Sequence, residues 1–172
     1  MNTAEAQAPP AGATAPSPVA DEAASAQSVA ATSARAGGDG LALVVGGSSG
    51  IGMDAARRLL QRGVSVLLVA RNADKLEDAA RQLSPHAAAG TGAGVSTRAL
   101  DLRDAAAVRA AAAEIEAGPA LRYVVNAAGV FSPKPFVEHT EEDYDAYHDI
   151  NRATLFLTQA AERNMVAAAA RW

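Results

Sequence analysis

The sequence predicts a doubly wound α/β fold built on one parallel sheet. Four short apolar runs alternate with longer helical stretches along most of the chain, at positions 41–45, 64–70, 95–100 and 121–125. Strands separated by helices of about ten residues or more need crossover connections, which make neighbouring strands parallel and are right-handed. The doubly wound arrangement predicts the strand order 3-2-1-4, with ligands bound beyond the carboxyl ends of the strands.

A glycine-rich turn follows the first apolar run, Leu41–Val45. After it, apolar residues recur at helical spacing from Ile51 to Leu60, and Gly63 stands where a helix-ending glycine belongs. Glycine permits positive φ and a close approach of backbone to ligand, and a helix start offers free N–H groups at its positive end. The pattern predicts a phosphate-binding strand, turn and helix. The alternative is an ordinary flexible loop, which the flanking strand and helix disfavour.

The remaining elements follow in order. The run 64–70 is typical of a strand buried on both faces, and a helix over 73–83 ends at Ser84-Pro85. The more polar run 95–100 suits an outer strand. Helices are predicted over 104–117 and from Thr140 to about 170, the second opened by a capping hydroxyl and three acidic residues.

Composition limits the domain organisation of the chain and the classes of partner that it can bind. Residues 1–40 are rich in Ala, Pro and Ser and carry no aromatic residue or periodicity, so we expect a disordered tail before a single domain at 41–172. A net charge of −4 with scattered basic residues argues against nucleic acid. No run reaches the roughly 18 apolar residues of a membrane span, and no secretory signal is evident. These patterns predict no membrane association and a cytoplasmic location.

Metal and thiol chemistry receive no support from the sequence. The chain has no cysteine, which excludes disulfides and thiolate sites. Its three histidines, His86, His139 and His148, share no metal-ligand spacing and are interpreted as surface or loop residues. We therefore expect no metal site.

The strand-end motifs together resemble the short-chain dehydrogenase/reductase family. They are Gly46-x-x-x-Gly50-Ile51-Gly52, Asp101-Leu102 after the third strand, Asn126-Ala127-Ala128-Gly129 after the fourth, and Asn151 in the last helix. The resemblance covers about Leu41 to Trp172. It implies a Rossmann-type NAD(P)-binding domain of which this chain holds strands 1 to 4, an incomplete, N-terminal cofactor-binding part.

The resemblance also implies roles for individual residues. The cofactor pyrophosphate would lie against the turn and helix start, formed by Gly46, Ser48, Ser49, Gly50, Ile51 and Gly52. Asp101 would accept a hydrogen bond from the adenine amino group, with Leu102 packed beside the ring. The segment containing Asn126, Ala127 and Gly129 would brace the central strands and line the site. For Asp101, the alternative is a turn or helix-capping aspartate.

The residue that follows the second strand favours NADP(H) over NAD(H). An acidic residue there would bind the ribose diol of NAD and repel a 2′-phosphate, but the chain reads Ala70-Arg71-Asn72. A guanidinium grips a phosphate through two parallel N–H bonds. The alternative is a solvated arginine at a strand end.

The catalytic residues that the resemblance implies are largely missing. Family chemistry uses a Tyr with a Lys four residues later and a Ser that polarises the carbonyl. Positions four after Tyr123, Tyr144 and Tyr147 hold Ala127, His148 and Asn151, so no Tyr-x-x-x-Lys is present. Only Asn151, a proton-relay position, carries over; its alternative is a polar residue satisfying the helix interior. Tyr144 and Tyr147 are interpreted as packing residues.

Two functions remain open from the sequence. The first is an NADP(H)-dependent oxidoreductase acting on a carbonyl or secondary alcohol, with this chain a fragment that is inactive alone. The second is a non-catalytic nucleotide-binding or dimer-interaction module. The resemblance also implies that the 140–170 helix can pair subunits in a homo-oligomer.

Overall fold

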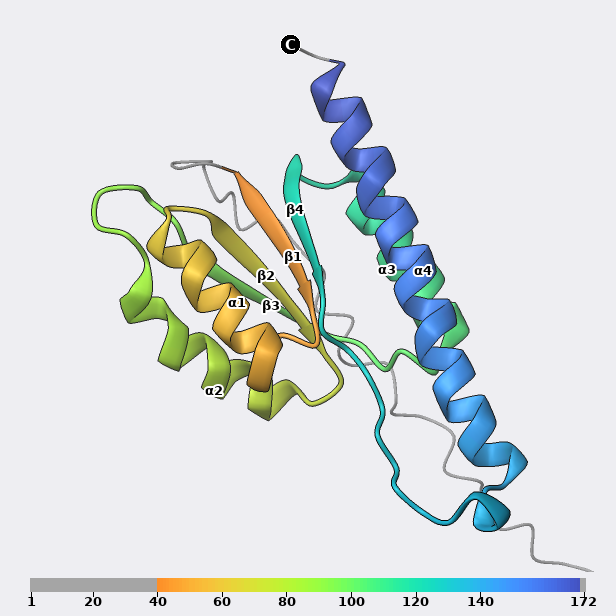
Figure 1. Cartoon of the computed structure of the whole chain (residues 1–172). Coiled ribbons are helices and arrows are strands. Elements are labelled where there is room, and N and C mark those ends of the chain that lie inside the picture. The colour runs from red at the N-terminus through yellow and green to blue at the C-terminus, as the bar shows by residue number, and fades with distance from the viewer. Residues whose placement is uncertain (1–39, 171–172) are drawn as a thin grey trace, which may run out of the picture.

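The computed structural model of the chain describes residues 40–170, which form one parallel sheet with helices on both faces (Figure 1). The predicted disordered tail lies, apart from Gly40, outside the described residues. The strands are β1 (Leu41–Val45), β2 (Ser65–Ala70), β3 (Val95–Ala99) and β4 (Leu121–Asn126). Their order, β3-β2-β1-β4, confirms the predicted topology and places β3 at an outer position.

Two helices cover each face of the sheet (Figure 1). Helices α1 (Gly50–Gln61) and α2 (Ala73–Leu83) pack on one face, and α3 (Ala105–Ala117) and α4 (Glu141–Ala169) on the other; short 3-10 turns occupy Ser84–His86 and Phe136–Glu138. Alternate residues of β1 serve the two faces: Val44 packs toward α1 and α2, Leu43 toward α3 and α4. Burial on both faces explains the unbroken apolar runs of β1 and β2.

The predicted element boundaries are wrong by one residue at several ends. Val64 is not part of β2, because its N–H donates to the Leu59 carbonyl at 3.0 Å and closes the turn after α1. Asp104, the predicted first residue of the helix over 104–117, is instead its N-cap, whereas Thr140 caps the last helix as predicted. The Asp104 carboxylate accepts from the backbone N–H groups of the first turn of α3, and Thr140 forms a reciprocal capping box with Asp143 at α4. β3 ends one residue early, and β4 continues to Asn126.

One buried amide fastens α4 to the connection between α3 and β4. The Asn164 side chain is buried on α4, where its Oδ1 accepts from the Leu121 N–H at 2.8 Å. Its Nδ2 donates to three carbonyl oxygens at the end of α3, those of Ile115, Glu116 and Gly118, at 3.1 to 3.3 Å. A helix C-terminus leaves carbonyls without intrahelical partners, and this one side chain satisfies several of them.

The turn after β1 packs directly against the start of α1 and the end of β4. Gly46 has φ +81, and a Cβ there would lie 2.6 Å from the Ala127 carbonyl carbon. A Cβ on Gly52 would lie 2.3 Å from the Gly46 carbonyl oxygen. Both positions therefore require glycine, because backbone occupies the space of a side chain.

Replacing Asn164 with leucine, which has a similar volume, should lower the free energy of unfolding by about 2–4 kcal/mol, because the Leu121 N–H and the α3 carbonyls lose their buried partner. Urea unfolding followed by circular dichroism measures this. Gln159→Leu, an exposed change on the same helix, should stay within about 0.5 kcal/mol of the parent. Equal effects of the two substitutions would contradict the role given to Asn164.

Gly52→Ala should destabilise the fold by about 1–3 kcal/mol, since α1 must move away from β1 to admit the methyl group. Gly129→Ala is the matched control, because a Cβ there meets no heavy atom within 4 Å. The same urea measurement applies. A Gly52 variant as stable as the Gly129 variant would show that the junction relaxes freely.

Candidate functional site

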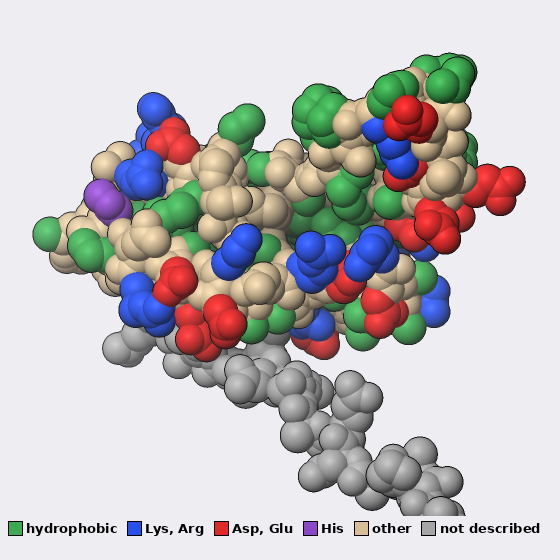
Figure 2. All heavy atoms as spheres, turned by 90° about the horizontal axis from the view of Figure 1, so that it is seen from below, with side chains coloured by type: hydrophobic (Ala, Val, Ile, Leu, Met, Phe, Trp, Pro, Cys, Tyr) green, Lys and Arg blue, Asp and Glu red, His purple; other side chains and the backbone are tan. Residues whose placement is uncertain are grey.

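The predicted site residues gather at the carboxyl edge of the sheet. The glycine turn follows β1, Arg71 follows β2, Asp101-Leu102 follows β3, and the segment 126–129 ends and follows β4. Because the four strands are parallel, these segments meet at one edge. Figure 2 views the molecule from this side and shows several Lys and Arg side chains close together across the middle of the face.

The first backbone N–H groups of α1 receive no side-chain cap. Its N-cap, Ser49, makes no side-chain cap hydrogen bond, and no acidic residue occupies the first turn. Side chains cap the other three α-helices of the described residues: Asn72 at α2, Asp104 at α3 and Thr140 at α4. The first backbone N–H groups of a helix have no intrahelical acceptor. The first turn of α1 therefore presents donors to an anion at the positive end of the helix dipole.

The surface around these donors is open and partly apolar. Gly50 adopts φ +53, and a Cβ there would meet no heavy atom within 4 Å. Beside it, the Ile51 side chain is 83% exposed, while Ser48 is half-buried and Ser49 exposed. A large exposed aliphatic side chain next to free backbone donors would suit a ligand with both a charged and an apolar part.

The segment after β4 is held against the turn by backbone contacts. The Ala127 N–H donates to the Val45 carbonyl at 2.8 Å, so the chain continues beside β1 after the strand ends. The Asn126 Oδ1 accepts from the Ala128 N–H at 3.3 Å and closes a local turn. Bracing of the central strands thus comes from the Ala127 backbone, whereas the Asn126 side chain orders its own turn. Gly129 is exposed at the rim.

The Asp101 carboxylate is held by Arg103. It accepts from the Arg103 backbone N–H at 3.0 Å and from the guanidinium Nε and Nη2 at 3.4 and 3.2 Å. Hydrogen bonds from Arg103 lower the pKa of Asp101, and the charge of Arg71 adds a smaller effect. Asp101 is therefore ionised and forms a turn, the alternative considered from sequence, while its role toward adenine stays a prediction. The sequence reasoning missed Arg103, although an Asp-x-Arg turn is its signal.

The loop before α4 is fastened to the helix by side chains that sequence reasoning did not pair. The Tyr147 Oη accepts from the Ser132 N–H at 3.0 Å. Lys134 forms an ion pair with Asp143, and its hydrogen bond is the main reason that the pKa of Asp143 falls to about 2. The hydrogen bond from the Ser132 N–H ties Tyr147 to the loop before α4, and its interpretation as a packing residue stays a prediction. Tyr144 is exposed and stacks on His148 with ring centroids 5.8 Å apart.

The Asn151 side chain is exposed on α4. The alternative reading from sequence, a polar residue satisfying the helix interior, is therefore wrong. The Asn151 backbone carbonyl accepts from the Thr154 hydroxyl at 3.0 Å.

Residues 40–170 offer no cluster of His, Cys, Asp and Glu side chains able to hold a metal ion. Within the same range, no helix combines the length and the apolar character needed to cross a membrane.

Comparison with known proteins gives a consistent result. The family model of the short chain dehydrogenases matches residues 40–171. A 3-dehydrosphinganine reductase of Arabidopsis thaliana is 39% identical over 110 residues, which cover 64% of this chain and 32% of the relative. Gluconate 5-dehydrogenase of Gluconobacter oxydans is 37% identical over 128 residues, covering 73% and 48%. The chain thus spans a third to a half of the length of these relatives.

Solved structures agree with the sequence matches. L-sorbose reductase from Gluconobacter frateurii, complexed with NADPH and L-sorbose, has a TM-score of 0.64 at 28% identity, covering 74% of this chain and 48% of that one. A short-chain dehydrogenase from Sphingobium yanoikuyae in complex with NADPH has a TM-score of 0.67 at 27% identity, covering 76% and 50%. With its sheet order, its glycine turn and a family match over nearly all described residues, the chain belongs to the short-chain dehydrogenase family.

Proposed function

We propose that this chain binds NADP(H) at the carboxyl edge of its sheet, as the cofactor-binding part of an oxidoreductase that acts on a carbonyl or secondary alcohol. The observation that carries the proposal is the uncapped start of α1 behind a turn in which Gly46 and Gly52 admit no side chain. Those donors suit the pyrophosphate, whose charge would complete the first turn of the helix.

Each remaining site residue has a place along the nucleotide in this proposal. The backbone and hydroxyl groups of Ser48 and Ser49 would add donors beside the pyrophosphate. Asp101 would accept from the adenine amino group through lone pairs that Arg103 leaves open, with Leu102 against the ring. The exposed Gly129 and the segment Asn126–Ala127 would line the opposite wall, where they lie beside the end of β1.

Charge supports NADP(H) over NAD(H). Arg71 is exposed directly after β2, and its positive charge reaches Asp101 at the end of β3. An arginine there would bind the 2′-phosphate of the adenosine ribose and leaves no carboxylate at that position to bind the ribose diol. The two solved structures described above are complexes with NADPH, which agrees with this preference.

Hydride transfer would need an acid that these residues do not supply. Asn151 is exposed and is proposed at the relay position, where it would hold a water. Lys134 is engaged with Asp143, and Tyr147 with the Ser132 N–H, so neither forms a Tyr–Lys pair. The proposed role of this chain is therefore to hold and orient the cofactor.

A second candidate is a nucleotide-binding or dimer-interaction module without catalysis. It is favoured by the outer side of α4, where Leu155, Phe156 and Val166 are 63%, 47% and 62% exposed. Exposed apolar side chains along one long helix are typical of a subunit contact. The reading frame beyond the Trp172 codon separates the two candidates: a following Ser and Tyr-x-x-x-Lys supports the enzyme, and a stop codon supports the module.

Arg71→Ala should weaken NADPH binding by about tenfold or more, because a charge-assisted contact to the 2′-phosphate is lost, while NADH binding stays within about twofold. Isothermal titration calorimetry with both nucleotides measures the change. Arg62→Ala, an exposed arginine at the opposite end of α1, is the matched control. Unchanged NADPH affinity, with NADH bound equally well, would rule out the proposed preference.

The 172-residue chain alone should show no carbonyl-dependent oxidation of NADPH, because it lacks the proton-donating Tyr–Lys pair. The assay is loss of NADPH absorbance with aliphatic and aromatic ketones, run beside a full-length short-chain reductase as a sensitivity control. Turnover that scales with the amount of pure protein would overturn this expectation.

A further inference from the structure

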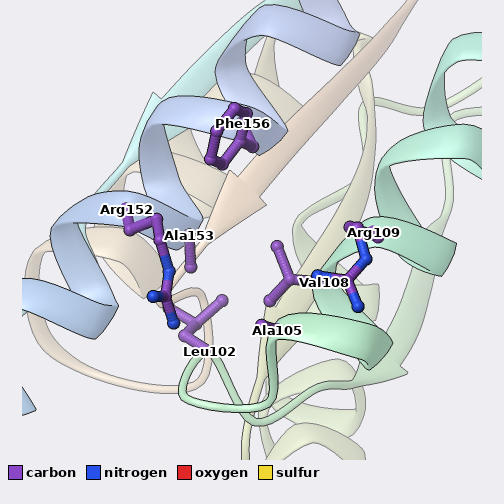
Figure 3. A pocket seen from close by; sticks show the side chains of 7 residues that line it. All are labelled: Leu102, Ala105, Val108, Arg109, Arg152, Ala153 and Phe156. Carbon is purple, nitrogen blue, oxygen red and sulfur yellow. The ribbon is translucent and has the colours of Figure 1, made fainter.

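A pocket of about 360 Å³ opens between α3 and α4 and is distinct from the glycine turn. We call it the α3–α4 pocket. Its apolar lining comes from the loop after β3 and from both helices, namely Leu102, Ala105, Val108, Ala153 and Phe156; Arg109 and Arg152 complete it. Figure 3 shows α3 and α4 as its two walls, with Leu102 at one end and Phe156 toward the other.

The lining offers apolar surface that the fold does not cover. Val108 and Ala153 are buried parts of the core and form its deep side. Phe156 is 47% exposed, so nearly half of an aromatic side chain faces water beside this hollow. A volume in this range suits a small organic ligand, and covering such a surface is favourable by about 25 cal/mol per Å² of apolar area.

Two guanidinium groups flank the apolar lining from opposite walls. Arg109 projects from α3 and Arg152 from α4, one on either side of Val108 and Ala153 (Figure 3). Arg109 is exposed. Arg152 donates through Nη2 to Asp149 at 2.8 Å, which leaves its other N–H groups available.

The charge balance favours a ligand with one negative charge. The Asp149 carboxylate pairs with Arg152 and so offsets one of the two guanidinium charges. The charge of Asp149 also helps to raise the pKa of Arg103. The pocket walls therefore keep one net positive charge. A carboxylate matches that charge and the forked geometry of an arginine, whereas a phosphate monoester carries close to two charges at neutral pH.

We propose that the α3–α4 pocket binds a medium-chain carboxylate, with its aliphatic chain against Val108, Ala153 and Phe156 and its carboxylate between Arg109 and Arg152. The pocket adjoins the proposed nucleotide site, because Leu102 lines the pocket and is also proposed to pack beside the adenine ring. No residue of the glycine turn lines the pocket.

The test is calorimetric titration of the full 172-residue chain with octanoate. Octanoate should bind at least about tenfold more tightly than octan-1-ol, and octylammonium should not bind, because the head group must satisfy two guanidinium groups. From butanoate to octanoate, affinity should rise about three- to fourfold per methylene. Tighter binding of octyl phosphate than octanoate would overturn the assignment to a carboxylate.

Substitutions inside and outside the α3–α4 pocket test where octanoate binds. Arg109→Gln and Arg152→Gln should each weaken octanoate binding about tenfold, and Arg81→Gln, an exposed arginine paired with Asp78 on α2, should not. Ala105→Phe, which fills the pocket, should abolish binding, and Ala110→Phe, at an exposed position on the same helix, should preserve it. Far-UV circular dichroism checks that each variant is folded.

Three results would overturn the proposal. The first is octanoate affinity that is unchanged in both pocket arginine variants. The second is octanoate binding that survives Ala105→Phe and is displaced by NADPH, which would place octanoate in the nucleotide site. The third is no binding at millimolar octanoate, together with a dimer in analytical ultracentrifugation that Phe156→Ala dissociates, which would assign this surface to a second copy of the chain.

Discussion

The contact between the Gly46 carbonyl and Gly52 is the constraint on which the site depends. Because neither residue carries a Cβ, the end of β1, the first turn of α1 and the segment after β4 approach one another at backbone distance. The hydrogen bond from the Ala127 N–H to the Val45 carbonyl fixes the third of these partners. This close packing fixes where α1 begins relative to the carboxyl edge of the sheet. The position of its first backbone N–H groups therefore follows from the packing of the two glycines.

Three carboxylates of the described residues are held by nearby groups. Asp101 is bound by Arg103, Asp143 by Lys134 and Thr140, and Asp104 by the first turn of α3. The first turn of α1 differs from the other described α-helix starts, because it has neither a side-chain cap nor an acidic residue.

Most of the fold was accessible from sequence because its signals are local. The apolar runs, the glycines and the capping residue Thr140 act over a few positions, so errors reached only about one residue at the element ends. The contacts that escaped prediction join distant residues. Nothing in the sequence near Asn164 pairs it with Ile115 and Leu121, and the Ser132–Tyr147 bond depends on the path of the intervening loop. The depth of the α3–α4 pocket likewise follows from helix packing.

The amide of Asn164 has a consequence for cooperativity. Its bonds close chain segments of 43 to 49 residues, and these segments are nested because their near ends all lie between Ile115 and Leu121. The entropy lost on closing a loop depends only weakly on its length, so the first of these bonds carries nearly all of that cost and the others form with little further loss. The end of α3, the start of β4 and the second half of α4 should therefore order together as one unit.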